Sequence, residues 1–299
     1  MTETTRPIVV GVAESHGAWG APDWAAREAL RRDLPLRLVH AWEAGLPEET
    51  TPAEPEASQA HARHVLRGVR DWLRERYPRL DLTAEQVHRP PVPALIAEAE
   101  NAELLVVGAQ DPSGLGGFLS GSLALATAAR IDRPLVLVRG GQSAEDEHLP
   151  DADGRPSQRT PLRDVVVAVD IDGSSHEVLQ AAFHAAELRR APLRVVHAWH
   201  APFPHGYDSA DEHRRARERA DRELAELLEP WRDRHPAVYV KGELHEGRPA
   251  HVLVHATAGA GLVVVGHRTR RAGTGPHTGA VAHALIHHVH GPVVLVPHG

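Results

Sequence analysis

The sequence contains no cysteine, one methionine and only 4% aromatic residues among its 299 residues. Without cysteine, the chain cannot form a disulfide framework or a thiolate-ligated metal site. No apolar run approaches the roughly 18 residues that a membrane-spanning helix needs. The opening residues 1–10 also lack the charged segment and long apolar stretch that are typical of a secretory leader. We therefore expect a cytoplasmic protein without a membrane partner.

Lysine is almost absent, because Lys241 is the only one in the chain. The basic residues are thus nearly all arginine, and acidic residues are interleaved with them, which leaves a formal net charge of −7. Nucleic-acid binding needs clustered, uncompensated positive charge to neutralise phosphates. The charge pattern therefore argues against a nucleic-acid partner.

An internal repeat spans almost the whole chain. PLRLVHAW at 35–42 returns as PLRVVHAW at 192–199, ELLVVG at 103–108 as GLVVVG at 261–266, and RPLVLV at 133–138 as GPVVLV at 291–296. Because order and spacing are kept, with an offset of 157 or 158 residues, two copies of one unit follow each other. We expect a first domain at 1–140, an exposed linker rich in Gly, Pro, Ser and acids at 141–161, and a second domain at 162–299.

Within the first copy, short β-branched runs alternate with longer segments that carry apolar residues at helical spacing. The runs are 8–12, 36–41, 80–87, 104–107 and 135–138, and the helical segments are 23–32, 58–76, 93–101 and 121–129. Parallel strands need crossover connections, so this alternation predicts an α/β fold with a doubly wound, five-stranded parallel sheet of order 3-2-1-4-5. In such sheets ligands bind at the carboxyl ends of the strands where the order reverses, here between strands one and four.

The fifth strand is apolar in both copies. An exposed apolar edge strand favours unwanted pairing with other chains. We therefore expect the two copies to cover each other as an intramolecular pseudo-dimer, and association of two whole chains into a homodimer stays open.

The segment after the fourth strand of the first copy carries glycines suited to an anion. Gly108 ends the strand without a Cβ, so a ribose or phosphate can approach the backbone closely. Gly121 and Ser122 stand where a helix is predicted to begin, and free amides and the positive dipole end of a helix attract anions. Asp111 lies between Gly108 and Gly121 in the sequence. Its carboxylate would repel a polyphosphate unless it faces solvent.

This pattern of Gly108, two residues, Asp111, nine residues, then Gly121 and Ser122 resembles the nucleotide-binding signature of the universal stress protein family, with its second glycine replaced. The VHAW, VVG and PLVLV or PVVLV strands of both copies fit the same family. The resemblance implies two tandem flavodoxin-like (Rossmann-like) domains, ATP as ligand, and a role in stress response.

The resemblance also implies ligand contacts in both copies, each of which has lost part of the signature. In the first copy Ala13 replaces the family's acid, and the adenine nucleotide would meet Gly108, Gln110, Gly121, Ser122, Leu123, Ala13 and Ala41. A weaker second site would use Asp170, Ala198, Gly266, Arg268, Gly279 and Ala280. In that copy Thr269 replaces a glycine and Ala280 replaces the serine.

A nucleotide-binding stress-response module with degenerate sites is therefore the leading hypothesis. A scaffold that binds a protein partner with both pockets inactive, or a slow ATPase, stays open. The sequence offers no Gly-Lys-Ser/Thr motif and no elbow-type Ser-His-Asp order, so no catalytic residue is predicted. His283 and His287 have the i,i+4 spacing of metal ligands, but without a third ligand nearby we predict no metal.

Overall fold

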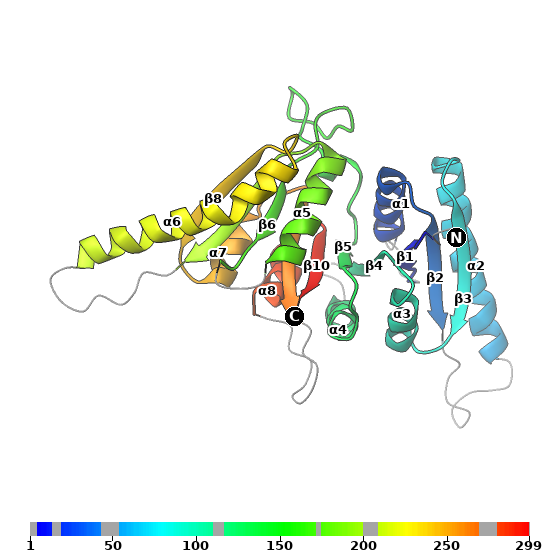
Figure 1. The fold of residues 1–299 in the computed structure, drawn as a ribbon. Helices are drawn as coiled ribbons and strands as arrows, with labels where there is room; N and C mark the ends of the chain where they lie inside the picture. The colour runs from blue at the N-terminus through cyan, green and yellow to red at the C-terminus, as the bar shows by residue number, and fades with distance from the viewer. Residues whose placement is uncertain are drawn as a thin grey trace. The chain divides into compact units, whose positions relative to one another are not determined.

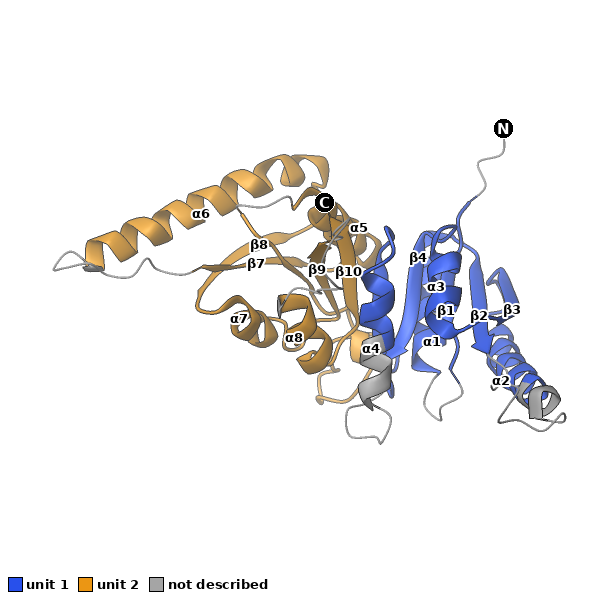
Figure 2. Cartoon of the chain, turned by 90° about the horizontal axis from the view of Figure 1, so that it is seen from below, with its two compact units in different colours: residues 1–144, 269–277 blue, residues 145–268, 278–299 orange. Residues whose placement is uncertain are grey.

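The computed structural model describes residues 5–13, 19–42, 54–109, 117–171, 175–199, 209–268 and 280–298. These residues form two compact units, which divide between Ala144 and Glu145 (Figures 1 and 2). Unit 1 corresponds to the first sequence copy and unit 2 to the second. Both have the α/β fold that the sequence predicts.

The five described strands of unit 1 are parallel and lie in the order β3-β2-β1-β4-β5, which is the predicted order. They are β1 (Ile8–Gly11), β2 (Leu36–Trp42), β3 (Leu82–His88), β4 (Leu104–Ala109) and β5 (Leu135–Arg139). The central strands β1 and β4 are continuous apolar runs with nearly every side chain buried. Such runs are typical of parallel strands that helices cover on both faces.

Four described helices cover the sheet of unit 1. They are α1 (Gly20–Arg32), α2 (Glu54–Arg76), α3 (Pro91–Ala99) and α4 (Gly117–Ala128). Right-handed crossovers place α1 and α2 on one face, and the reversal of strand order after β3 places α3 and α4 on the other. Accordingly α1 contacts α2, and α3 contacts α4.

Unit 2 repeats this arrangement with the strand order β8-β7-β6-β9-β10. Its strands are β6 (Val165–Ala168), β7 (Leu193–Trp199), β8 (Val240–Glu246), β9 (Leu262–Arg268) and β10 (Val293–His298). Its helices are α5 (His176–Arg189), α6 (Ser209–Arg234), α7 (Pro249–Ala256) and α8 (Ala280–His288). A proline opens both α3 and α7, where its fixed φ suits the first turn and its missing N–H is not needed.

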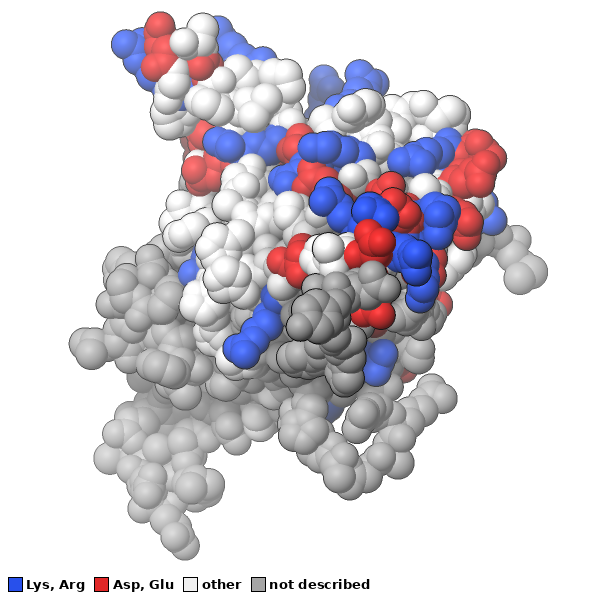
Figure 3. Space-filling model, turned by 90° about the vertical axis from the view of Figure 1, so that its left-hand side faces the viewer, with Lys and Arg blue, Asp and Glu red and all other residues white. Residues whose placement is uncertain are grey.

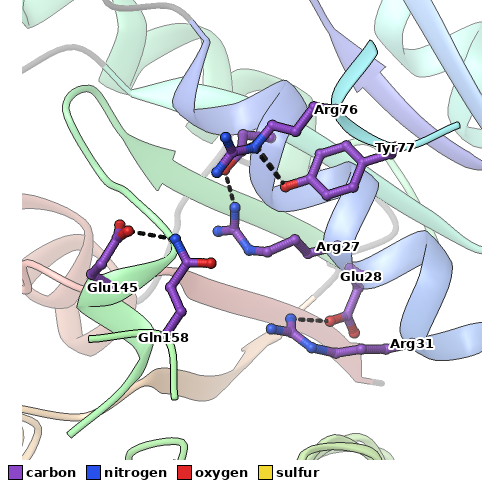
Figure 4. Close-up of polar contacts among 8 residues, drawn as sticks. Arg27, Glu28, Arg31, Arg76, Tyr77, Glu145 and Gln158 are labelled. Atoms are coloured by element: carbon purple, nitrogen blue, oxygen red, sulfur yellow. Dashed lines mark hydrogen bonds and ion pairs between the residues drawn. The ribbon is translucent and has the colours of Figure 1, made fainter. Parts of the chain in front are cut away.

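The junction between the first two helices differs chemically in the two units. In unit 1 the buried Asp23 of α1 accepts a hydrogen bond from the Tyr77 hydroxyl at 2.8 Å and forms ion pairs with Arg27 and Arg76. Arg76 also donates to the Tyr77 hydroxyl at 3.3 Å (Figure 4). In unit 2 the ring of Phe183 in α5 stacks on Trp231 of α6, with 5.3 Å between ring centroids. Both junctions combine aromatic and charged contacts, since Trp19 packs edge-on against Trp72 in unit 1 and His235 lies 3.2 Å from Glu187 in unit 2.

Residues 141–161, predicted as an exposed linker, contain a hydrogen-bonded arm. His148 and Leu162 form an antiparallel bridge. At the tip, one carboxylate oxygen of Asp151 accepts the amides of Asp153 and Arg155 at 2.9 and 2.8 Å, which closes a turn of the kind that aspartate favours. Most of the arm is exposed, as the composition suggests, but its backbone pairs with itself.

The arm joins unit 2 at the beginning of β9. Arg163 donates its amide to the carbonyl of Glu147 at 2.8 Å, and a Cβ added to Gly261 would lie 3.0 Å from the Cβ of Arg163. Gly261 therefore allows the arm to approach closely. The equivalent position in unit 1 is Glu103, which carries a long side chain.

Charged side chains of both signs are mixed on the face drawn in Figure 3. On α6, for example, Arg214 pairs with Asp211 at 2.8 Å and lies 3.9 Å from Glu218. In the part of the chain that the structure describes, no helix combines the length and the apolar character needed to cross a bilayer.

A cross-strand ion pair in unit 2 generates a pH prediction. Arg194 of β7 makes two hydrogen bonds to the Glu243 carboxylate of β8, at 3.1 and 2.8 Å, and Lys241 lies 2.9 Å from the same group. The hydrogen bond from Arg194 is the largest cause that lowers the pKa of Glu243 to about 2. A carboxylate with a lowered folded-state pKa stabilises the fold above its ordinary pKa, and this contribution is lost as the pH falls toward 2.

We expect Arg194→Ala to lower the free energy of unfolding by about 1 to 3 kcal/mol at pH 7, and by clearly less at pH 3. Chemical denaturation at both pH values measures the difference. Arg214→Ala, which removes an exposed pair, is the control, with an expected loss of about 0 to 1 kcal/mol. An equal loss of stability for Arg194→Ala at both pH values would contradict the claim that Arg194 lowers the pKa of Glu243.

Candidate functional site

The structure brings three predicted contacts of unit 1 to the same edge of the sheet. Ala13 follows β1, Ala41 lies near the end of β2, and Gly108 lies near the end of β4. Because β1 pairs with β2 on one side and with β4 on the other, these residues are neighbours at the point where crevices form in such sheets. Ala13 and Gly108 are exposed, and Ala41 is half-buried. Gln110 lies outside the described residues.

The helix that follows begins earlier than the sequence predicts. Its first residue is Gly117, so Gly121, Ser122 and Leu123 lie in its second turn. A helix leaves only its first four amides without an intrahelical partner, and these belong to residues 117–120. The amides available to an anion are therefore shifted by one turn from the predicted position.

A buried histidine, which the sequence reasoning missed, fixes the first strand end. The Nδ1 atom of His40 lies 2.8 Å from the Val12 carbonyl oxygen, and the Val12 amide donates to the Val39 carbonyl at 2.8 Å. In unit 2 the Nδ1 atom of His197 lies 3.0 Å from the Val169 carbonyl oxygen. Each histidine thus holds the chain that leads into the crevice. The repeated VHAW motif was the available signal.

The equivalent edge of unit 2 carries more charge. Asp170 follows β6 and is exposed, its carbonyl accepts a hydrogen bond from Ser175 at 2.8 Å, and Ala198 is half-buried near the end of β7. Gly266 and the exposed Arg268 lie at the end of β9. Ala280 is the first residue of α8, whereas Gly279 lies outside the described residues.

A histidine of β10 completes this edge. His298 is opposite Arg268 in the strand register. Burial is the largest cause that lowers the pKa of His298, and the positive charge of Arg268 lowers it further, while Glu177 and Asp170 act in the opposite direction. His298 is therefore neutral at pH 7.5.

Comparison with known proteins assigns both units to one family. The model of the universal stress protein family matches residues 4–139 and 161–297, which include both repeats. The chain belongs to the universal stress protein family. This confirms the family that the glycine pattern and the matched strands predict.

Two relatives in this family come from Mycobacterium tuberculosis. Universal stress protein Rv2005c is 30% identical over 301 residues, covering 96% of each chain. Universal stress protein Rv2623 is 30% identical over 299 residues, covering 96% of this chain and 95% of its own. The crystal structure of a universal stress protein from Archaeoglobus fulgidus has the same fold, with a TM-score of 0.70 at 14% identity, and the match covers 98% of this chain and 97% of that chain. The protein is thus a tandem universal stress protein.

The first glycine of the family signature has different surroundings in the two units. Among the described residues, a Cβ added to Gly108 would meet only the Cβ of Ala21, at an ordinary distance of 3.6 Å. A Cβ added to Gly266 would lie 2.8 Å from two ring atoms of His298 and 3.0 Å from a methyl group of Val178. The described residues thus leave the face of Gly108 open and cover the face of Gly266.

In the described ranges, no group of three or more His, Asp or Glu side chains is placed to hold a metal ion. His283 and His287 of α8 do lie together, with their ring centroids 4.5 Å apart.

The contact of His40 with the strand end predicts a stability effect. We expect His40→Phe to lower the free energy of unfolding by about 1 to 3 kcal/mol, because the buried Val12 carbonyl loses a hydrogen-bond partner. Urea unfolding at pH 7.5 measures this. The exposed His64→Phe is the control, expected to change stability by less than about 0.5 kcal/mol. Equal stability of the two variants would rule out the positioning role of His40.

Proposed function

We propose that unit 1 of this tandem universal stress protein binds an adenine nucleotide, ATP, at the carboxyl ends of β1, β2 and β4. The chain then acts as a nucleotide-responsive module of stress response. The observation that carries this proposal is the exposed Gly108, whose face is open among the described residues and which lies where the strand order reverses.

The residues around the crevice suit the parts of a nucleotide. The backbone at Gly108 lets the ribose or α-phosphate approach, since no side chain projects there. Ala13 and Ala41 offer small apolar surfaces beside the base. The first turn of α4 supplies free amides and a positive dipole end for the phosphates, with Gln110, Gly121, Ser122 and Leu123 nearby in the chain.

The replacement of the family's acid by Ala13 weakens this site without abolishing it. A lost hydrogen bond to a sugar hydroxyl costs about 0.5 to 1.5 kcal/mol, which lowers affinity by up to roughly tenfold. Ala13, Ala41 and Gly108 also carry no group that can transfer a proton.

Calorimetry with ATP and analysis of co-purifying nucleotide test the proposal. Bound nucleotide on the purified chain and a saturable heat of binding support it. Silence in both assays would favour the protein-binding scaffold instead. Release of phosphate above a blank without protein would favour the slow ATPase.

We expect Gly108→Val to weaken ATP binding at least tenfold while the fold is kept. The added Cβ meets Ala21 at 3.6 Å, an ordinary contact, and the two methyl groups then fill the space that the ligand needs. Calorimetry gives the affinity, and circular dichroism checks the fold.

Gly68→Ala is the matched control, because a Cβ at Gly68 of α2 meets nothing within 4 Å among the described residues. It should leave ATP affinity unchanged and stabilise the helix by about 0.5 to 1 kcal/mol. Unchanged affinity in a folded Gly108→Val variant would refute the assignment of the crevice.

A further inference from the structure

The ring of His298 packs directly against the backbone of Gly266. The ring atoms Cδ2 and Nε2 both lie 2.8 Å from the position of a Cβ at Gly266, and Val178 of α5 closes the same space from the helix side at 3.0 Å. Real Cβ atoms essentially never occur this close to another atom, so the two side chains occupy the position that a Cβ would take at Gly266. A group of a bound ligand could reach this side of the backbone only after the ring had moved.

Unit 1 lacks both covering side chains. In the register, Val296 pairs with Gly266 and Val138 pairs with Gly108, so the residue that matches His298 is Gly140. The repeat offset of 157 residues matches Val178 with Ala21. The imidazole of His298 thus corresponds to the hydrogen atom of Gly140, and the isopropyl group of Val178 corresponds to the methyl group of Ala21.

We propose that His298, together with Val178, excludes nucleotide from unit 2, so that the tandem chain has one nucleotide site and it lies in unit 1. This inference rests on the proposed function for its ligand, because Gly266 is the counterpart of Gly108. His298 is then the residue that decides which of two homologous crevices is occupied.

The charges around His298 are compatible with a closed crevice at neutral pH. Burial lowers the pKa of the ring, and Arg268 and His267 of β9 lower it further, against Glu177 of α5 and Asp170 after β6. The ring is therefore uncharged at pH 7.5 and can stay packed without burying a charge. Glu177 adds a negative charge beside the crevice where unit 1 has Gly20.

The test exchanges the covering residues between the units. Calorimetry with ATP at pH 7.5 on the full chain should give one ATP per wild-type chain and two per chain of the variant His298→Gly, Val178→Ala. The reciprocal variant Gly140→His, Ala21→Val should lower the affinity of unit 1 at least tenfold. His298→Phe keeps a ring over Gly266 and should stay at one ATP per chain.

A ligand-independent measurement checks the packing itself. Gly266→Ala should lower Tm by about 2 to 4 °C in the wild-type background, since the new methyl group collides with the ring. The fall should be smaller in the His298→Gly, Val178→Ala background. An equal fall in both backgrounds would overturn the claim that these two side chains fill the space.

The outcomes separate this inference from the proposed function. The opened variant is His298→Gly, Val178→Ala. If the wild-type chain binds two ATP, or if the opened variant binds no more ATP than the wild type, the exclusion by His298 is overturned and nucleotide binding by unit 1 stays intact. If the wild-type chain binds no ATP, the proposed function fails. If the wild-type chain binds no ATP but the opened variant binds one, the result still supports the exclusion of nucleotide from unit 2 by His298. If neither binds ATP, that exclusion is overturned as well.

Discussion

The reversal of crossover direction between two neighbouring strands is the constraint on which the functional features of this protein depend. In unit 1 the chain leaves β1 toward β2 and leaves β4 toward β5, so the connections that follow β1 and β4 part at their carboxyl ends. No crossover helix passes directly over the point where these connections part, so side chains of the neighbouring strand and helix decide how much of the backbone is covered. Glycine or a small residue at these ends leaves space for a ligand, and a large side chain fills it.

Duplication has supplied this constraint twice, and the two copies have diverged at the strand ends in complementary ways. Unit 1 has lost the family's acid, because Ala13 stands in its place, but Gly108 is open among the described residues. Unit 2 keeps Asp170 and Arg268, but its Gly266 lies beneath His298. Retention of signature residues therefore does not by itself identify the copy that can accept a ligand. In the proposal made above, the side chains of the neighbouring strand and helix decide it.

The same divergence is visible in parts of the fold that hold no ligand. Asp23 and its partners lie at the contact between the first two helices of unit 1, where unit 2 has the stacked rings of Phe183 and Trp231. The amino end of β4 carries Glu103, whereas the amino end of β9 carries Gly261, which accommodates the arm. Conserved geometry with exchanged chemistry is expected when packing volume and satisfied polar groups, rather than residue identity, maintain a fold.

The sequence by itself determined the two copies, the parallel sheets with their strand order, and the family, because β-branched runs, helical periodicity and the repeat are local or nearly local signals. It misplaced the start of α4, since the glycines before Gly121 read as a loop and a helix interior tolerates glycine at a cost of about 1 kcal/mol. The repeated VHAW motif marked His40 without showing its contact with Val12, and the composition of residues 141–161 did not show that they pair with themselves. Only the tertiary structure showed that His298 covers Gly266. The two residues are 32 positions apart in the sequence and meet because they lie on neighbouring strands, and nothing local distinguishes His298 among the 23 histidines. Contacts between parallel neighbours depend on register and on the volume left between a strand and its helix, and neither is written in a short stretch of sequence.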